Sequence, residues 1–222
     1  MPACQLMLLH RDDPAKDPLV GNVKVTQQDW INAALAALKS GGVETVKVAE
    51  LATRLDVSRS SFYWYFKNRT GLLDALLVYW EQTNTAAIRQ QAQAPADTVT
   101  AACCNIFRCN VDPDLFDERL DFAIRAWGQH SQHVETRVRS ADADRIDALA
   151  AMFTRFDYPR REALARARVI YYMQLGYDGS GLKESIEDRL NLVPEYIFVY
   201  TGRLATKAEL TAFSAYARSV AQ

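Results

Sequence analysis

The chain has 222 residues, of which 49% are hydrophobic, so it can bury a core, and disorder is excluded as the default expectation. Its net charge of −1 excludes a protein that is basic throughout. The charge is uneven, because residues 19–80 hold seven Lys/Arg against five Asp/Glu and residues 81–222 hold 17 against 19. A slightly basic front end fits a protein that presents only that end to a polyanion.

Neither the apolar segments nor the cysteines indicate export. No apolar run approaches the ~20 residues of a membrane span, and the first ten residues lack the basic start of a signal peptide. Cys4, Cys103, Cys104 and Cys109 lack zinc spacing, so no metal or disulfide framework is expected. The last three lie on one predicted helix and are expected to be small buried hydrophobes rather than oxidant sensors. We therefore expect a cytoplasmic protein without a cofactor.

The chain begins with a leader, residues 1–25, which is charged and punctuated by prolines. We expect the leader to be loose or extended, whether packed on the body or disordered. The first helix is predicted over residues 26–40, with Thr26 as its N-cap and Asp29 in its first turn. Two consecutive glycines then stop it.

Two short helices follow, joined by a tight turn. The first is predicted over residues 47–55 and the second over residues 59–65, with Ser58 as N-cap of the second. Asp56 stands where the turn needs a left-handed residue, a conformation that aspartate tolerates better than most. This order of elements is that of a helix-turn-helix.

A long helix is predicted next, from Asn68 or Thr70 to about Gln93, connecting the front unit to the rest. Beyond it the helical periodicity continues, without convincing period-two alternation or hairpin turns. The further helices are predicted over residues 97–110, 113–129, 131–156, 159–177, 185–190, 194–202 and 206–220. The fold class is therefore all-α, with an N-terminal three-helix unit (26–70) followed by a larger helical domain (71–222).

The second short helix carries residues suited to DNA. A helix fits the major groove of B-DNA, and small polar residues near its N-terminus let the backbone approach closely. Ser58, Arg59, Ser60 and Ser61 form such a cluster. Arg59 is its only long donor, and the sequence leaves open whether Arg59 contacts a guanine or only a phosphate.

Lysine and aromatic side chains flank this cluster. Tyr63 and Tyr65 can offer hydroxyls to phosphates, and Lys67 is expected to be exposed beside them. Lys47, at the start of the preceding helix, can reach the DNA backbone where helical amides also point. For either lysine, a solvated charge is the alternative. Trp64 is predicted at the surface, with a place in the core as its alternative.

Phe62 and Phe66, four residues apart, are expected to anchor the second short helix in the core. They belong to a dense motif within residues 30–77, which consists of Leu51-Ala52, Leu55, Val57-Ser58, the aromatic run from Phe62 to Phe66, Asn68-Arg69 and Leu72-Leu73. With this motif, the stretch of residues 30–77 resembles the DNA-binding domain of the TetR family of bacterial transcriptional regulators.

Three positions depart from the family's pattern. Asp56 replaces the usual glycine, and Ser60 stands where glycine is frequent. Both substitutes are small or tolerated in turns, so they are expected to alter detail more than fold. Lys47 stands where a hydroxyl residue is common, which favours a contact with phosphate over a capping role.

A weaker resemblance, to the ligand-side domain of one subgroup of the family, covers residues 120–153 and 166–177. It implies a homodimer formed through the C-terminal helices and a small-molecule effector bound among the middle helices. It also implies a repressor, in which the effector shifts the long connecting helix and releases operator DNA.

Polar-tipped and aromatic residues on the middle helices are candidates for an effector pocket, in which arginine would meet an acid. The alternative for each of them is an ordinary core aromatic or a surface arginine. The nearly all-round apolar segment 169–175 favours burial on two sides, against the core and a second copy. The pocket candidates are Asn105, Arg108, Arg125, Trp127, Tyr171 and Tyr172.

Catalysis is not expected. The chain has three histidines, no glycine-rich phosphate loop and no metal-protease or nucleophile-elbow motif. His130 and His133 share a helix face without a partner at metal spacing, and a solvated helix start is favoured for them. The remaining alternative to a DNA-binding regulator is a helical interaction or sensor protein that has lost specific DNA binding.

Overall fold

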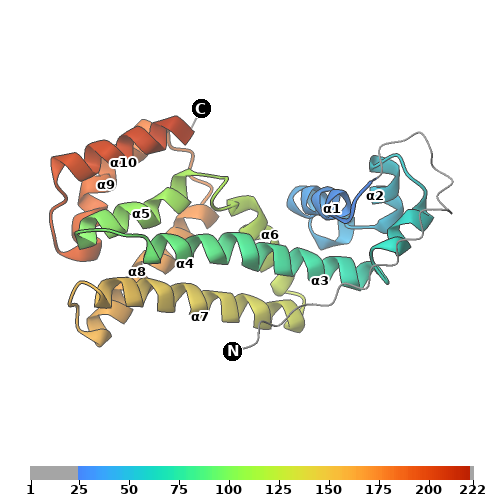
Figure 1. Ribbon diagram of the computed structural model, residues 1–222, viewed down its shortest axis with the longest axis horizontal. Coiled ribbons are helices and arrows are strands. Elements are labelled where there is room, and N and C mark those ends of the chain that lie inside the picture. Colours follow the sequence, from blue (N-terminus) through green and yellow to red (C-terminus); the bar gives the residue numbers. More distant parts are fainter. Residues whose placement is uncertain (1–24, 221–222) are drawn as a thin grey trace.

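The computed structural model describes residues 25–220, all of whose regular elements are helices, so the predicted all-α class is confirmed. The predictions for the leader lie outside the described residues. Figure 1 shows a small head at one end of an elongated body. The elements in chain order are α1 (Gln27–Gly41), η2 (Val43–Thr45), α2 (Val48–Arg54), η3 (Arg59–Trp64), α3 (Arg69–Trp80), η4 (Glu81–Thr85), α4 (Ala86–Gln93), α5 (Val99–Val111), α6 (Glu118–Gly128), α7 (Gln132–Thr154), α8 (Arg160–Gly179), α9 (Ile186–Thr201) and α10 (Lys207–Val220).

The head consists of α1, α2 and η3, packed on the start of α3. Thr26 caps α1 in a reciprocal capping box with Asp29, as the sequence predicts. The rings of Trp30 and Phe62 are both fully buried and meet edge to face at 5.2 Å. Phe66 stacks on Phe62 at 5.4 Å, so the two phenylalanines anchor η3 in the core as expected.

The elements α3, η4 and α4 form one continuous rod that leads from the head into the body (Figure 1). Asn68 caps its start by accepting a hydrogen bond from the Gly71 amide, and the rod ends after Gln93, both as predicted. The π-helical turn η4 in its middle was not predicted. π-turns concentrate at functional sites, and this one carries two buried polar residues, Asn84 and Thr85.

The body surrounds the second half of the rod with helices α5 to α10. α7 packs along both the rod and α8, while α5 packs against α4 and α10. Cys103, Cys104 and Cys109 are buried in α5, as expected, and burial raises the pKa of Cys104 and Cys109 to about 12. These thiols are therefore poor nucleophiles and pack as small apolar groups.

The head and body share a core. Leu120 and Ile124 of α6 are buried together with the head residues Trp30 and Leu38. The ion pair between Lys39 Nζ and Asp117 Oδ2, 2.7 Å apart, joins α1 to the cap of α6 at the surface. The proposed domain boundary near residue 70 therefore stays a prediction, because the apolar contacts continue across it.

Two helix predictions are wrong in instructive ways. α6 begins at Glu118 rather than near residue 113, because Asp117 accepts a hydrogen bond from the Leu120 amide and caps the helix there. α9 is one helix with Pro194 inside it, although two helices were predicted. Proline removes one backbone hydrogen bond, but buried apolar residues on both sides hold α9 against the core.

Candidate functional site

The helix-turn-helix geometry arises in the segment from α2 to η3. Asp56 adopts φ 54°, so it occupies the left-handed turn position as predicted. The Val57 amide donates to the Ala52 carbonyl over 3.0 Å and closes the turn. η3 is a six-residue 3₁₀ helix rather than the expected α-helix, and Ser58 makes no side-chain cap. Instead, the hydroxyls of Ser58 and Ser60 bond to each other at 2.8 Å.

Most of the predicted DNA-facing side chains are exposed around η3. Tyr63 and Trp64 expose 53% and 59% of their surface, which favours the surface role for Trp64. Lys47 lies at the N-cap of α2, where it pairs with Glu50 in an exposed ion pair that contributes little stability. We define the η3 surface as the exposed residues Lys47, Ser58, Arg59, Ser60, Tyr63, Trp64 and Lys67.

Two of the predicted residues do not belong to this surface. Ser61 is 5% exposed, and its hydroxyl donates to the Ser58 carbonyl over 2.8 Å. Tyr65 is partly buried, and its hydroxyl donates to the Val25 carbonyl over 2.7 Å. Both hydroxyls are satisfied inside the head, so both residues are removed from the predicted DNA face.

Arg69, one of the residues that carry the family resemblance, bonds to the backbone inside the head. Its Nε and Nη2 donate to the carbonyls of Val46 and Val43, each over 2.6 Å. The arginine therefore fixes the segment before α2 to the start of the rod. Its fixed geometry helps hold the two halves of the helix-turn-helix in one orientation.

The six predicted pocket residues do not converge on one cavity. Asn105 donates to the Pro95 carbonyl, Arg108 lies over the Tyr216 ring, and Trp127 packs at the edge of the head core. Tyr172 is 48% exposed on α8. As a common pocket, the prediction for these four residues is wrong, because each side chain points to a different neighbour.

The other two candidates, Arg125 and Tyr171, belong to a partly buried charge network. Arg125 Nη2 donates to Asp142 Oδ1 over 2.6 Å and to the Tyr171 hydroxyl over 2.7 Å, and Arg125 Nε donates to Asp121 Oδ2 over 2.7 Å. The Tyr171 hydroxyl donates to Asp142 Oδ1. Burial and Asp142 raise the pKa of Tyr171 well above its ordinary value, although the two arginines oppose the shift. The phenol is therefore neutral.

Arg145 is the central member of this network, and its side chain is fully buried. Nη1 donates to Asp121 Oδ1 over 2.9 Å, and Nε donates to Thr85 Oγ1 in η4 over 3.0 Å. Asp121 Oδ1 also accepts from Trp80 Nε1 over 2.7 Å. The rod thus meets α6 and α7 through one guanidinium and one carboxylate.

Sequence reasoning missed Arg145, although a signal was present. Arg145 falls in the apolar stripe of its helix, four residues after Ala141 and four before Leu149, where an arginine must be paired. Burial would raise the pKa of Asp121, but the charges of Arg145 and Arg125 outweigh burial and lower it. Asp121 is therefore ionised at neutral pH.

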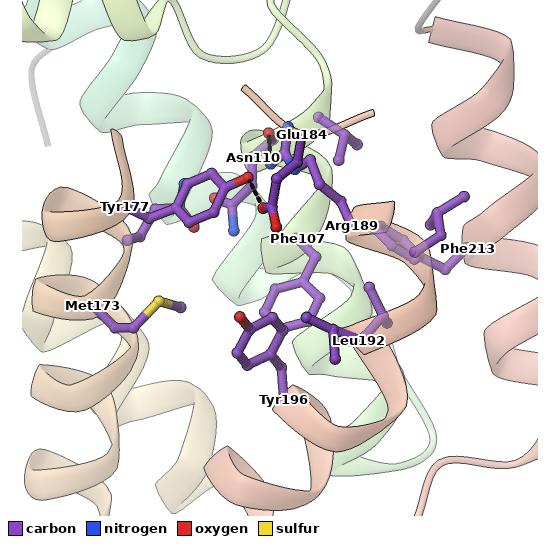
Figure 2. Close-up of a pocket in the computed structure, with 13 residues that line it drawn as sticks. Phe107, Asn110, Met173, Tyr177, Glu184, Arg189, Leu192, Tyr196 and Phe213 are labelled. Carbon is purple, nitrogen blue, oxygen red and sulfur yellow. Dashed lines mark hydrogen bonds between the residues drawn. The ribbon is translucent and has the colours of Figure 1, made fainter. Parts of the chain in front are cut away.

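Among the cavities between the middle helices of the described part of the chain, three share lining residues. The first, of about 50 Å³, is drawn in Figure 2, where Met173, Tyr196 and Phe107 line its apolar part. At its upper rim the Tyr177 hydroxyl donates to Glu184 over 2.5 Å. The second, of about 400 Å³, is polar and lies near Asp112 and Arg119. We call the third, of about 40 Å³, the inner cavity.

The inner cavity is mostly apolar and touches the charge network. Arg145 and Tyr171 form part of its wall, together with Ile106, Phe116 and Leu149. Asn110 and Gln174 line all three cavities, so the three are neighbours around these two side chains. A mostly apolar space with a few polar groups is typical of small-molecule sites.

Asp178 lies where the inner and polar cavities meet. Burial, with Glu118 and Asp121 of α6 nearby, raises its pKa from the ordinary 3.8 to about 7, against the opposing effects of Gln174 and Arg189. At this carboxyl group the folded chain therefore holds up to one proton more than the unfolded chain between pH 3.8 and about 7.

We expect the Asp178→Asn variant to respond differently to pH. For the native residue, stability falls as pH rises through this window, because the folded state must give up a proton and bury a charge. The variant should therefore gain stability relative to the native chain between pH 5 and pH 8, as measured by thermal unfolding. The exposed Asp144→Asn is the control, and an equal gain in both variants would contradict the assignment.

The described residues hold no group of three or more His, Cys, Asp or Glu side chains that could bind a metal ion. His133 Nε2 lies 3.3 Å from Asp74 Oδ1 at the surface, so this histidine contacts the rod. None of the helices between residues 25 and 220 combines the length and apolarity needed to cross a membrane.

Known proteins resemble the chain mainly in its head. Residues 31–76 match the family described as bacterial regulatory proteins of the tetR family. The regulator BetI of Serratia proteamaculans is 34% identical over 80 residues, 36% of this chain and 40% of BetI. The class C tetracycline repressor of Escherichia coli is 42% identical over 53 residues, 24% of each chain. The chain thus spans less than half the length of these curated relatives.

A solved transcriptional regulator from Rhodococcus sp. Rha1 has the same overall fold. It superposes with a TM-score of 0.54 at 15% identity, covering 88% of this chain and 96% of that one. Head and body together thus define a helix-turn-helix protein with a helical companion domain. In the head, residues 31–76 match the model of the tetR family of bacterial regulatory proteins, so the likeness to that family is carried by this segment.

Proposed function

We propose that the protein is a transcriptional regulator that binds operator DNA through the η3 surface as a homodimer. The observation that carries the proposal is the row of exposed donors and aromatics on a short helix, in a head that matches the tetR family. Tyrosine, serine and lysine donors suit phosphates, and Arg59 can reach a base edge. Such a protein acts where the DNA is, so we infer a cytoplasmic location.

We propose that α8 and α9 form the dimer interface. These helices leave large apolar side chains exposed, an arrangement that favours burial against a second copy. Leu192 and Val199 are seven residues apart and therefore lie on one face of α9. The exposed apolar residues are Leu164, Val169 and Tyr172 on α8, and Leu192, Phe198 and Val199 on α9.

Release by a small molecule is proposed through the rod. The cavities adjoin α4, α5 and α8, and the charge network ties the same region to η4. A dimer reads two half-sites roughly one helical turn, ~34–36 Å, apart, so a small shift of the rods changes the spacing of the heads. We therefore propose that the protein is a repressor and that an effector releases it from its operator.

Selection of bound sequences from random duplex DNA, followed by binding measurements against salt, tests the proposal. Specific binding should recover a symmetric site and weaken steeply as salt rises, because phosphate contacts release counterions. The alternative is a helical sensor that has lost DNA binding. It predicts that no sequence is enriched and that affinity is absent even at low salt.

Replacing Arg59 with alanine should weaken binding to the selected site by about 1–3 kcal/mol per half-site if the side chain reads a guanine. Fluorescence anisotropy on matched and single-base variant duplexes measures the loss and shows which position is relaxed. A uniform loss over all sequences would indicate phosphate contact alone. The control, Arg203→Ala, removes an equal charge in the exposed loop between α9 and α10, far from the head (Figure 1).

A further inference from the structure

One nitrogen of Arg145 has no hydrogen-bond partner in the charge network. Nε and Nη1 are hydrogen bonded to the rod and to α6, but Nη2 has no acceptor among the described residues. The guanidinium contacts the rings of Trp80 and Phe116, with its carbon 4.9 Å and 5.4 Å from their centroids. A buried donor without an acceptor costs stability, so an acceptor supplied by a ligand at this position would lower the free energy.

The same arginine forms part of the wall of the inner cavity. Most of that wall is apolar, contributed by Ile88, Ile106, Leu149 and Ile170 among others. A molecule in this space would therefore bury an apolar body and meet few polar groups. The neighbouring polar cavity, of about 400 Å³, gives room for the remainder of a larger molecule.

The charges around the cavity indicate what kind of acceptor fits. The positive charge of Arg145 is already compensated by Asp121 at 2.9 Å, and Arg125 is compensated by Asp142 at 2.6 Å. Among the described residues, Asp178 is the only acidic or basic side chain besides Arg145 that lines the inner cavity, so no second cation faces a ligand there. An anionic ligand would lose its hydration without gaining an uncompensated cation. An uncharged acceptor avoids this cost.

We propose that the inner cavity binds uncharged, largely apolar small molecules that carry a carbonyl-type oxygen, which accepts a hydrogen bond from Arg145 Nη2. The inference deepens the proposed function, and in its regulatory part it rests on that function. Arg145 Nε donates a hydrogen bond to Thr85 in η4 and so fixes the rod. A ligand bound to Nη2 would pull on the same guanidinium and could move it away from Thr85. The side chain of Arg145 would thus both contact the ligand and hold the rod.

Three probes of nearly equal size and shape test the acceptor without changing the protein. They are acetophenone, its hydrocarbon isostere α-methylstyrene, and benzoate. Binding is measured on the full chain without DNA, by calorimetry and by protein NMR. Acetophenone should bind at least about tenfold more tightly than α-methylstyrene, since only the ketone pairs Nη2, and more tightly than benzoate. Equal affinities, tighter binding of benzoate, or no binding of any probe would overturn the proposal.

A variant then assigns the preference to the side chain. Arg145→Lys keeps the charge beside Asp121 but has no second nitrogen to turn into the cavity, so the preference for acetophenone should shrink towards one. Arg125→Lys is the matched control, because Arg125 belongs to the same network but does not line the inner cavity. Its preference for the ketone should remain. Preference lost in both variants, or kept in both, would contradict the role of Arg145.

The outcome is separable from that of the proposed function. Ligand binding is measured without DNA, so an absent acetophenone preference defeats the inference even when operator binding is found. Conversely, a chain that shows the preference but binds no DNA would defeat the proposed function and leave the ligand site intact. Release of selected DNA by acetophenone, and not by α-methylstyrene at equal concentration, would show that the ligand site controls DNA binding.

Discussion

Replacing Asp121 with alanine should lower the free energy of unfolding by about 3–5 kcal/mol, because it leaves buried arginine charges without their partner. Asp121 bonds Arg145, Arg125 and the Trp80 indole at once, and each of these contacts is 2.9 Å or shorter. The loss should be measured by urea unfolding at neutral pH, where the carboxylate is fully ionised.

The exposed Asp147→Ala, on the helix that carries Arg145, is the control and should change stability by less than about 0.5 kcal/mol. A similarly small loss for Asp121→Ala would mean that the guanidinium is not held by this carboxylate. The native chain should also lose stability in strong acid, because the pKa of Asp121 is lowered in the fold and protonation removes its pairing.

The helical body could be predicted because its elements follow local rules. Thr26 and Asn68 cap their helices as their residue types suggest, and Gly202 ends α9 with a left-handed φ of 69°. Apolar periodicity identified the buried faces of most helices. One boundary failed because a local cap at Asp117 was missed, and another because Pro194 continues a helix that the core holds in place.

The helix-turn-helix could be predicted in outline, and the side chains of its DNA face only in part. Ser61 and Tyr65 have the residue types of DNA contacts, but a hydroxyl that finds a carbonyl in its own fold is no longer free. The acceptor for Ser61 lies three residues away, whereas that for Tyr65 lies 40 residues away in sequence. Periodicity alone carries no information about such a distant partner.

The candidate ligand site was the hardest part to predict. Arg125 and Tyr171 were chosen as polar groups on middle helices, and they do meet, through Asp142. Arg145, which joins the network to the rod through Thr85, lies on a different helix from both. Convergence of side chains from α6, α7, α8 and η4 depends on how the helices pack, which residue types on single helices do not determine.

The proposed dimer makes the second large prediction. Replacing Val199 with glutamate should raise the dimer dissociation constant by at least about a thousandfold, or about 4 kcal/mol. Val199 is 66% exposed on α9, so the substitution leaves the core of one subunit untouched. In a two-fold interface every residue occurs twice, so two glutamates would enter the same apolar contact. Sedimentation equilibrium over a range of protein concentrations measures the change.

Val78→Glu is the matched control, since Val78 is 40% exposed on the rod and lies outside the proposed interface. It should leave the oligomeric state unchanged, and both variants should keep the helical circular dichroism of the native chain. A Val199→Glu chain that remains dimeric at micromolar concentration would exclude this face of α9 from the interface. A monomeric one should also lose specific operator affinity although its η3 surface is intact, because one head reaches only one half-site.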